Sequence, residues 1–239
     1  MKYIERYKTR WHDTDAERTV RPTQLLVYMQ ETSNRHMLSC GMGLDELRDT
    51  KGLAFILSKI KLTLHKPLYA SEEIEVETWT AGSRGFGFLR FYRILRGEEV
   101  IAECETTWAL VGLEDKKLYR VDAFDFGFSD DPAIDVGLPQ RFRVPKNEEL
   151  TSLGERRIVY SDLDYNMHMN NTRYADMLCD FLPIEKIPSI RGISLVYLHE
   201  AHFGDTVDLL CAERDGEYLI RTVNQEGVAC LEAQVLLEK

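Results

Sequence analysis

The chain has 239 residues, of which 44% are hydrophobic and 29% are charged, as in an ordinary globular protein of one large domain or two small ones. Its net charge of −10 argues against nonspecific binding to nucleic acid. No apolar run reaches the roughly 18 residues of a membrane span, and the polar N-terminus lacks the apolar core of a secretory signal and is too acidic for a transit peptide. We expect a cytoplasmic protein.

The predicted elements form two similar series, and the first begins in a strand-like pattern at the N-terminus. A helix is predicted from Pro22 to just before Gly41, because proline suits the first helical turn and glycine can end a helix. Leu25, Leu26 and Met29 fall near helical spacing on it. Hairpin-linked strands are predicted next, at 54–66, 72–82, 86–97 and 99–112.

A stretch with several prolines separates the two series, and we place a linker at 128–150. In the second series Asn170 or Asn171 is predicted to cap a helix over 172–182, and Pro183 ends it. Strands are then predicted at 192–200, 205–216, 217–227 and 228–238. Because consecutive strands are joined by short turns, both sheets should be mainly antiparallel.

The two series carry one motif twice. Placing "RWHDTDAERTVRPTQLL" (10–26) over "VYSDLDYNMHMNNTRYA" (159–175) superposes like residues at a constant shift: Asp13 with Asp162, Asp15 with Asp164, and Thr23 with Thr172. We therefore predict an α+β protein of two similar units, at 1–127 and 151–239, each with a long helix packed on one face of an antiparallel sheet.

Polar groups suited to chemistry are present in only the second copy. Asn166 stands opposite Glu17, His168 opposite Thr19, and Asn170 and Asn171 opposite Arg21 and Pro22. Capping of a helix and a turn accounts for the two adjacent asparagines, but it accounts less well for a histidine two residues from an asparagine. Asp162, which has a counterpart, is interpreted as structural. We predict one active site per chain, near the start of the second helix.

The stretch "SDLDYNMHMNNTRY" (161–174) resembles the D-x-N-x-H-x-N-N-x-x-Y signature of the acyl-acyl carrier protein (acyl-ACP) thioesterases. These are tandem hotdog-fold enzymes that release fatty acids from their carrier. The resemblance covers nearly the whole chain and implies catalytic roles for Asp164, Asn166 and His168. In "ISLVYLHEA" it places a fourth catalytic residue, Glu200, in a strand after the helix. Ala201 stands where the plant members often carry cysteine, which argues against a cysteine nucleophile.

Thioester hydrolysis needs an aligned water, a base for its proton and donors for the developing oxyanion. Glu200 or His168 could be the base, and Asn166 could donate to the carbonyl oxygen or orient the water. Asp164 would orient Asn166 or His168, or share the proton transfer. Direct attack by water and a transient covalent carboxylate both stay open.

Substrate binding is assigned to both copies. Asn170 and Asn171 open the second helix, whose free N–H groups and positive dipole end would suit a thioester oxygen. The resemblance implies that the first copy helps to form an apolar tunnel for the acyl chain. Candidate wall residues on the first helix are Leu25, Leu26, Met29, Met37 and Leu38. Ordinary core packing is the alternative for each of them.

The expected partner is an acyl carrier protein that carries a fatty acyl group, and a homodimer stays open. Cations that could attract an acidic carrier cluster in and after the linker, at Arg141, Arg143, Lys146, Arg156 and Arg157. A solvated charged face is the alternative. An acyl-CoA thioesterase of the same fold, a non-catalytic acyl-binding protein and a dehydratase or hydratase are the competing functions.

No metal or cofactor is expected. The five cysteines show no CxxC spacing and are interpreted as small buried hydrophobic residues. His199 and His202 flank Glu200, but no third ligand is evident, and strand alternation would send them to opposite faces. Ser161 lacks a G-x-S-x-G elbow, and Tyr174 is expected to pack rather than react.

Overall fold

The computed structural model describes residues 2–238, which divide into two compact units. The first unit takes in the chain up to residue 60 and residues 64–136, and the second takes in residues 61–63 and the chain from residue 137. The change of unit after residue 136 falls inside the predicted linker, 128–150, and the exact domain bounds stay a prediction.

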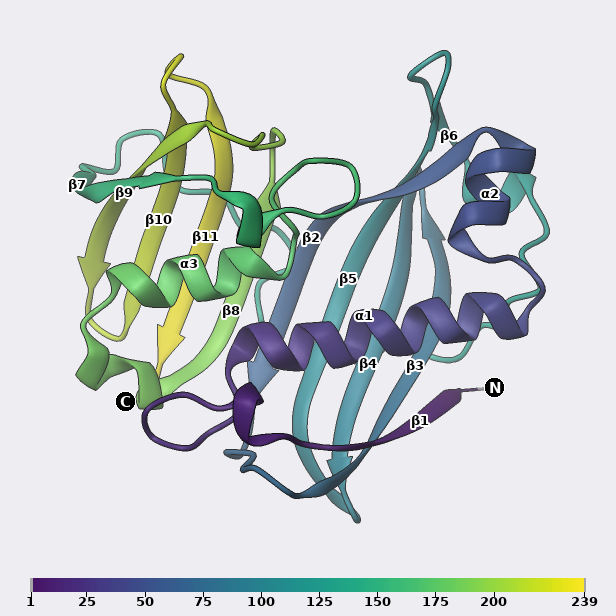
Figure 1. Ribbon diagram of the computed structural model, residues 1–239, viewed down its shortest axis with the longest axis horizontal. Coiled ribbons are helices and arrows are strands. Elements are labelled where there is room, and N and C mark those ends of the chain that lie inside the picture. Colours follow the sequence, from purple (N-terminus) through teal and green to yellow (C-terminus); the bar gives the residue numbers. More distant parts are fainter. Residues whose placement is uncertain (1, 239) are drawn as a thin grey trace. The chain divides into compact units, whose positions relative to one another are not determined.

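The first unit is an antiparallel sheet with a long helix across one face (Figure 1). Its elements are β1 (Tyr3–Lys8), α1 (Pro22–Ser39), α2 (Leu44–Lys51), β2 (Leu53–Leu64), β3 (Glu73–Arg84), β4 (Gly87–Arg96), β5 (Glu99–Gly112) and β6 (Leu118–Tyr119), with 3-10 turns at Trp11–Asp13 and Val121–Ala123. The strands lie in the order β1, β3, β4, β5, β2, and β6 pairs with β5.

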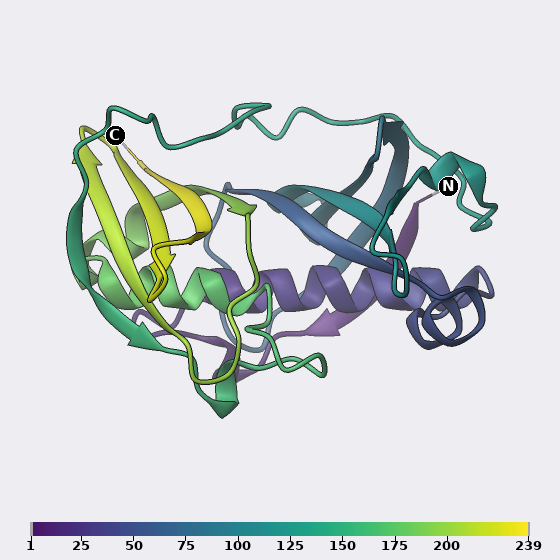
Figure 2. The ribbon, with the colours of Figure 1, turned by 90° about the horizontal axis from the view of Figure 1, so that it is seen from above.

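The second unit repeats this plan with a shorter helix (Figures 1 and 2). Its elements are β7 (Thr151–Arg157), α3 (Arg173–Phe181), β8 (Ile190–Tyr197), β9 (Thr206–Arg214), β10 (Glu217–Asn224) and β11 (Ala229–Leu237), with 3-10 turns at Tyr160–Asp162 and Ile184–Ser189. The strands lie in the order β7, β9, β10, β11, β8, which is the order of the first unit element by element.

A β-bulge recurs at the same place in both sheets. The register of β4 against β5 shifts between Ile94 and Leu95 and passes over Ile101, and that of β10 against β11 shifts between Thr222 and Val223 and passes over Cys230. An unpaired residue of this kind re-aims the chain beside it. The Cys230 carbonyl accepts the N–H groups of both Leu198 and His199, at 2.9 and 3.2 Å, directly after β8 ends.

The helices bury the faces that their sequences predict. Leu25, Leu26 and Met29 of α1 are 3%, 2% and 1% exposed, as helical spacing requires of a core-facing stripe. In α3 the buried residues include Tyr174 and Leu178. Burial of each large apolar side chain contributes about 1.5–3 kcal/mol to folding, so these stripes fix each helix on its sheet.

The predicted helices, strands and antiparallel pairing are confirmed, but strands β6 and β7 were not predicted, and the structure also differs in the following points. The second helix is not long: α3 has 9 residues against 18 in α1, because Pro183 disfavours helical geometry in the residue before it. Leu38, a candidate tunnel wall, is 64% exposed and lies outside the core. Helix α2 was not predicted, although Gly52 ends it in a left-handed conformation.

Among residues 2–238, no helix combines the length and apolar character that crossing a membrane requires.

Candidate functional site

The candidate site is built on the loop from residue 162 to residue 170, which follows β7. Asp162 is only 2% exposed and anchors the start of this loop. Its carboxylate accepts the backbone N–H of Val159 at 3.0 Å and a hydrogen bond from the guanidinium of Arg156 on β7. A buried carboxylate is stable only when it is paired in this way. The structure thus agrees with a structural role for Asp162.

Asp164 shapes the turn that carries the predicted catalytic residues. Its Oδ1 accepts the backbone N–H of Asn166 at 2.8 Å and that of His168 at 3.3 Å, an arrangement typical of aspartate in turns. The backbone closes the turn when Asp164 N–H donates to the His168 carbonyl at 2.8 Å. Met167 takes a φ of 65°, which lets the chain reverse between Asn166 and His168.

A short backbone pairing brings Glu200 to this loop. His168 forms an antiparallel bridge with His202, and Met169 N–H donates to the Ala201 carbonyl at 2.8 Å. Glu200 lies between β8 and this bridge, not within a strand as predicted. Two consecutive N–H groups, of Leu198 and His199, donate to the same Cys230 carbonyl, and β8 ends just before them at Tyr197. The alternation of side chains along a strand therefore does not apply to the residues that follow.

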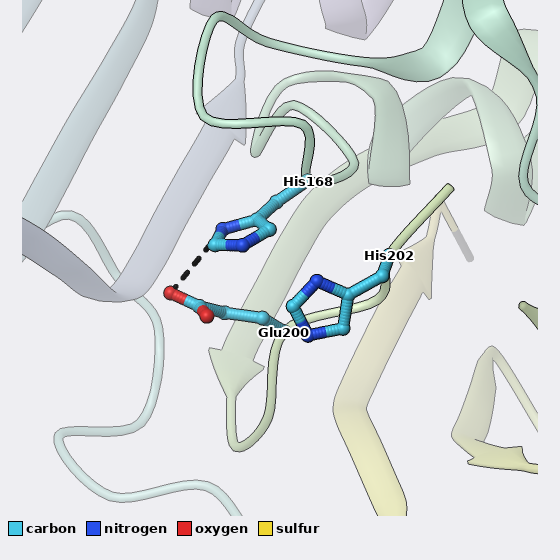
Figure 3. A group of neighbouring side chains, drawn as sticks. All are labelled: His168, Glu200 and His202. Carbon is cyan, nitrogen blue, oxygen red and sulfur yellow. Dashed lines mark ion pairs between the residues drawn. The ribbon is translucent and has the colours of Figure 1, made fainter.

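Three side chains converge at this bridge (Figure 3). Nδ1 of His168 lies 3.4 Å from Oε1 of Glu200, and their side chains are 26% and 55% exposed. The ring of His202 meets the ring of His168 edge to face, with centroids 4.5 Å apart. The group is therefore open to solvent and to a substrate, while its backbone is fixed.

The two asparagines before the helix form hydrogen bonds within the protein. Asn170 Oδ1 accepts both the N–H and the hydroxyl of Thr172, at 3.0 and 2.8 Å, and its carbonyl accepts the Arg173 N–H at 2.9 Å. Thr172, not an asparagine, occupies the N-cap position. The Asn171 carbonyl accepts the hydroxyl of Tyr197 at 2.7 Å. The predicted free N–H groups of Thr172 and Arg173 are therefore already donated, which corrects that part of the expectation.

Tyr174, Cys211 and Cys230 lie where reaction is disfavoured. Tyr174 is 3% exposed and packs edge to face on Tyr197, and burial raises its pKa well above the ordinary value. Burial likewise raises the pKa of Cys211 to about 11 and the pKa of Cys230. Cys104 is also buried, whereas Cys40 and Cys179 are only half-buried, against the expectation, and none of the five, all within residues 2–238, forms a disulfide. A buried thiol with a raised pKa is a poor nucleophile.

The predicted tunnel residues lie in the first unit, away from this loop in sequence. Leu25, Leu26 and Met29 are buried in its core. The first unit also holds a pocket of about 150 Å³, which none of these three residues lines. Its wall is part aromatic and part acidic and comes from the end of β3, from β4 and from the segment after β6: Gly82, Ser83, Phe88, Val121, Asp122, Phe124, Asp125, Phe126, Phe128 and Asp130. The role of Leu25, Leu26 and Met29 in substrate binding stays a prediction.

His202 is the member of the group that sequence reasoning missed. The strand does not continue to His202, because β8 ends at Tyr197, and His168 supplies the third donor that was not expected. The bridges that place it, Thr19 with Tyr69 in the first copy and His168 with His202 in the second, are contacts of the folded chain that the duplicated motif does not reach.

Two units with antiparallel strands in the same order, each with a helix across the strands, make this a tandem hotdog-fold protein. The chain belongs to the acyl-ACP thioesterase family. Residues 1–124 match the family's N-terminal domain, and residues 146–235 match its C-terminal domain, which contains the whole His168, Glu200 and His202 group.

Known proteins of this kind resemble the chain along most of its length. The chloroplastic palmitoyl-acyl carrier protein thioesterase of Cuphea hookeriana is 22% identical over 227 residues, which cover 88% of this chain and 54% of that protein. The chain thus spans about half the length of that curated relative.

Solved structures match almost end to end. The acyl-ACP thioesterase from Bacteroides thetaiotaomicron superposes with a TM-score of 0.89 at 21% identity, covering 99% of this chain and 98% of that one. The 12:0-ACP thioesterase from Umbellularia californica gives 0.84 at 17% identity, covering 99% and 97%. At these identities the likeness shows the shared fold.

Proposed function

We propose that this protein hydrolyses fatty acyl-ACP thioesters to free fatty acid and holo-ACP. The observation that carries the proposal is the contact of His168 with Glu200, at 3.4 Å, on a loop within the family's C-terminal domain. Both side chains are partly exposed, so a thioester and a water can reach them. The family membership and the names of the relatives supply the substrate class.

His168 and Glu200 act as a unit in this proposal. One of them takes a proton from water, the water oxygen attacks the thioester carbonyl, the C–S bond breaks, and the departing thiolate takes a proton. A base whose partner orients it is a recurring arrangement in hydrolases. The contact between Nδ1 and Oε1 fits His168 as the base with Glu200 as its orienting partner, and equally Glu200 as the base.

Asn166 and Asp164 have different roles. Asn166 is exposed on the turn two residues before His168, where its amide can donate to the carbonyl oxygen as negative charge develops. One carboxylate oxygen of Asp164 accepts the N–H groups of Asn166 and His168. We therefore assign Asp164 to positioning these two residues rather than to proton transfer.

The test is turnover on a panel of acyl-ACPs, with matched acyl-CoAs beside them, following both free thiol and fatty acid. We expect fatty acid release from acyl-ACP, with slower turnover of the same acyl chain on CoA. Equal or faster CoA turnover would make the protein an acyl-CoA thioesterase. Tight acyl-ACP binding without release would make it a binding protein.

In this proposal, exposed cations in and after the linker provide a docking surface for the acidic carrier. Arg141, Arg143, Lys146 and Arg157 are exposed. Arg156 is not available for docking, because it pairs with Asp162 and with Asp180. Steering by exposed charges weakens as salt screens them. We therefore expect Arg141→Glu with Lys146→Glu to raise KM for acyl-ACP at low salt, and to leave KM for acyl-CoA nearly unchanged.

The cytoplasmic location and the homodimer are also proposals. The curated relatives carry the word chloroplastic in their names, and fractionation of the source cells tests the location. Sedimentation velocity of the purified protein tests the dimer.

A further inference from the structure

The group formed by His168, Glu200 and His202 has the composition of a metal site. Each residue offers one ligand atom, and the three atoms lie within 4.8 Å of one another. Two imidazoles and one carboxylate form the ligand set that zinc takes in many hydrolases. Figure 3 shows the Glu200 carboxylate turned toward the His168 ring, with the His202 ring beside the Glu200 side chain.

One of the spacings in the group already has the value that a zinc ion requires, and the ligand atoms all lie within 4.8 Å of one another. Ligand atoms on a tetrahedral zinc ion are about 3.3–3.6 Å apart, since the bonds to nitrogen and oxygen are about 2.0–2.2 Å long. The distance of 3.4 Å between Nδ1 of His168 and Oε1 of Glu200 already meets this value. The Glu200 side chain is 55% exposed, so it can rotate to complete the set without disturbing the core.

The two imidazoles are held together by the backbone. The bridge between His168 and His202 fixes their separation, and the His202 N–H donates to Asp205 Oδ2 at 2.8 Å. Preorganised ligands lose little entropy on binding an ion. Solvent reaches the group, so water can take the remaining coordination position.

We infer that His168, Glu200 and His202 bind a divalent d-block ion, with Zn²⁺ as the preferred case, and that the bound ion inhibits the enzyme. Two imidazole donors favour Zn²⁺ over Mg²⁺ or Ca²⁺, which prefer oxygen ligands. The bound ion occupies a ring-nitrogen lone pair of His168 and draws charge from the Glu200 carboxylate, so both become weaker bases toward the proton of the attacking water. The inhibition rests on the proposed function, whereas the binding does not.

The first copy offers an internal reference. Its equivalents of His168, Glu200 and His202 are Thr19, Pro67 and Tyr69, which include no imidazole or carboxylate. We therefore expect a single ion of this kind per chain, bound in the second unit.

The binding test uses Co²⁺ as a coloured substitute for Zn²⁺ on the chelator-treated, full-length protein. We expect a visible absorption band that saturates at one ion per chain and is lost on addition of Zn²⁺. The variant His202→Phe keeps an aromatic ring against His168 but removes the ligand nitrogens, and His199→Gln is the matched control outside the group. Removal of a ligand should weaken binding by about tenfold or more, the scale seen even for outer-shell partners.

The activity test measures fatty acid release, because Zn²⁺ also binds the liberated carrier thiol. We expect Zn²⁺ to inhibit the wild type and His199→Gln alike, EDTA to restore both, and His202→Phe to need about tenfold or more Zn²⁺ for the same inhibition. Equal Zn²⁺ sensitivity of His202→Phe, stimulation by Zn²⁺, or no Co²⁺ band would each overturn the inference. If no acyl-ACP is turned over, the proposed function fails, and the Co²⁺ titration still decides the site.

Discussion

The two loops that follow β1 and β7 have nearly the same backbone and different chemistry. Three backbone hydrogen bonds close each loop, and each has a counterpart in the other loop. In the first loop the N–H groups of Asp15, Val20 and Arg21 donate to the carbonyls of Thr19, Leu68 and Asp13, at 2.9, 2.7 and 3.0 Å. In the second loop the N–H groups of Asp164, Met169 and Asn170 donate to the carbonyls of His168, Ala201 and Asp162, each at 2.8 Å. Even the residue with positive φ recurs, at Arg18 and Met167.

Comparison of the two loops distinguishes the residues that hold the loop backbone from the residues that can carry out chemistry. Asp15 accepts the N–H groups of Glu17 and Thr19 at 3.0 Å each, as Asp164 does for Asn166 and His168. A carboxylate that makes the same hydrogen bonds in both copies has a structural role in holding the loop. The side chains that differ are those that project from it.

The largest expected effect is loss of catalysis in the second loop alone. Glu200→Ala and His168→Ala should each lower turnover by about 10²-fold or more, the scale of a positioned proton acceptor. The double variant should be little worse than the weaker single one if the pair acts as a unit. Single-turnover rates on acyl-ACP measure this.

Glu17→Ala and Thr19→Ala are the matched controls in the first loop, and both should keep turnover near the wild-type rate. An inactive, folded Glu17→Ala protein would place part of the working site in the first copy and break the comparison.

The next largest effect concerns the buried anchors of the two loops. Asp162→Ala leaves Arg156, whose side chain is only 22% exposed, without its buried partner. We expect a loss of about 3 kcal/mol in the free energy of unfolding. Asp13→Ala should cost less, about 1–3 kcal/mol, because the Arg10 side chain is 65% exposed and can turn to water, while the buried Tyr28 hydroxyl loses its acceptor.

Urea titrations followed by circular dichroism compare the two anchor variants. Asp162→Ala should also lower turnover, whereas Asp13→Ala should not. Equal losses of stability would mean that the two anchors are interchangeable.

The first helix should set the acyl-chain length. Leu26→Phe or Met29→Trp adds volume to a filled apolar region, which costs about 1–3 kcal/mol where a long acyl chain must share it. Preference should shift toward shorter chains, as read from an acyl-length profile on ACP. Leu38→Phe, at an exposed position of the same helix, is the control and should leave the profile unchanged. An unaltered profile in all three variants would remove the tunnel from α1.

A smaller effect comes from His36, on the part of α1 that extends beyond the length of α3. Burial, helped by the positive charge of Arg90, lowers the pKa of His36 to about 4. The folded state thus holds the ring neutral, while the unfolded chain binds a proton below about pH 6.5. Stability is therefore complete above that pH and is lost as pH falls toward 4.

Between pH 7 and pH 5 this histidine should remove about 2 kcal/mol from the free energy of unfolding. His36→Gln should flatten the pH dependence, and His12→Gln, an exposed histidine of the same unit, should not. Tryptophan fluorescence reports this unit selectively, because Trp11, Trp79 and Trp108 all lie in it. Identical slopes for the wild type and His36→Gln would contradict the assignment.

Periodicity and turn residues determined most of the secondary structure from the sequence. The alternation in β2 to β5 and β8 to β11 and the helical stripe of α1 are local patterns, which a reader of the chain can follow without the fold. The duplicated motif also placed Asp164, Asn166 and His168 on one turn, because five consecutive residues cannot lie far apart. The sequence thus located the loop and indicated which copy carries the chemistry.

Only the tertiary structure decided what meets that loop. Glu200 and His202 reach His168 through a bridge that follows the early end of β8, and that end depends on the carbonyl of Cys230 in a bulge on another strand. Contacts between distant segments leave no periodic trace in either one. The same holds for Arg156, which reads as a surface cation in the sequence and becomes the partner of a buried aspartate once β7 is folded beside the loop.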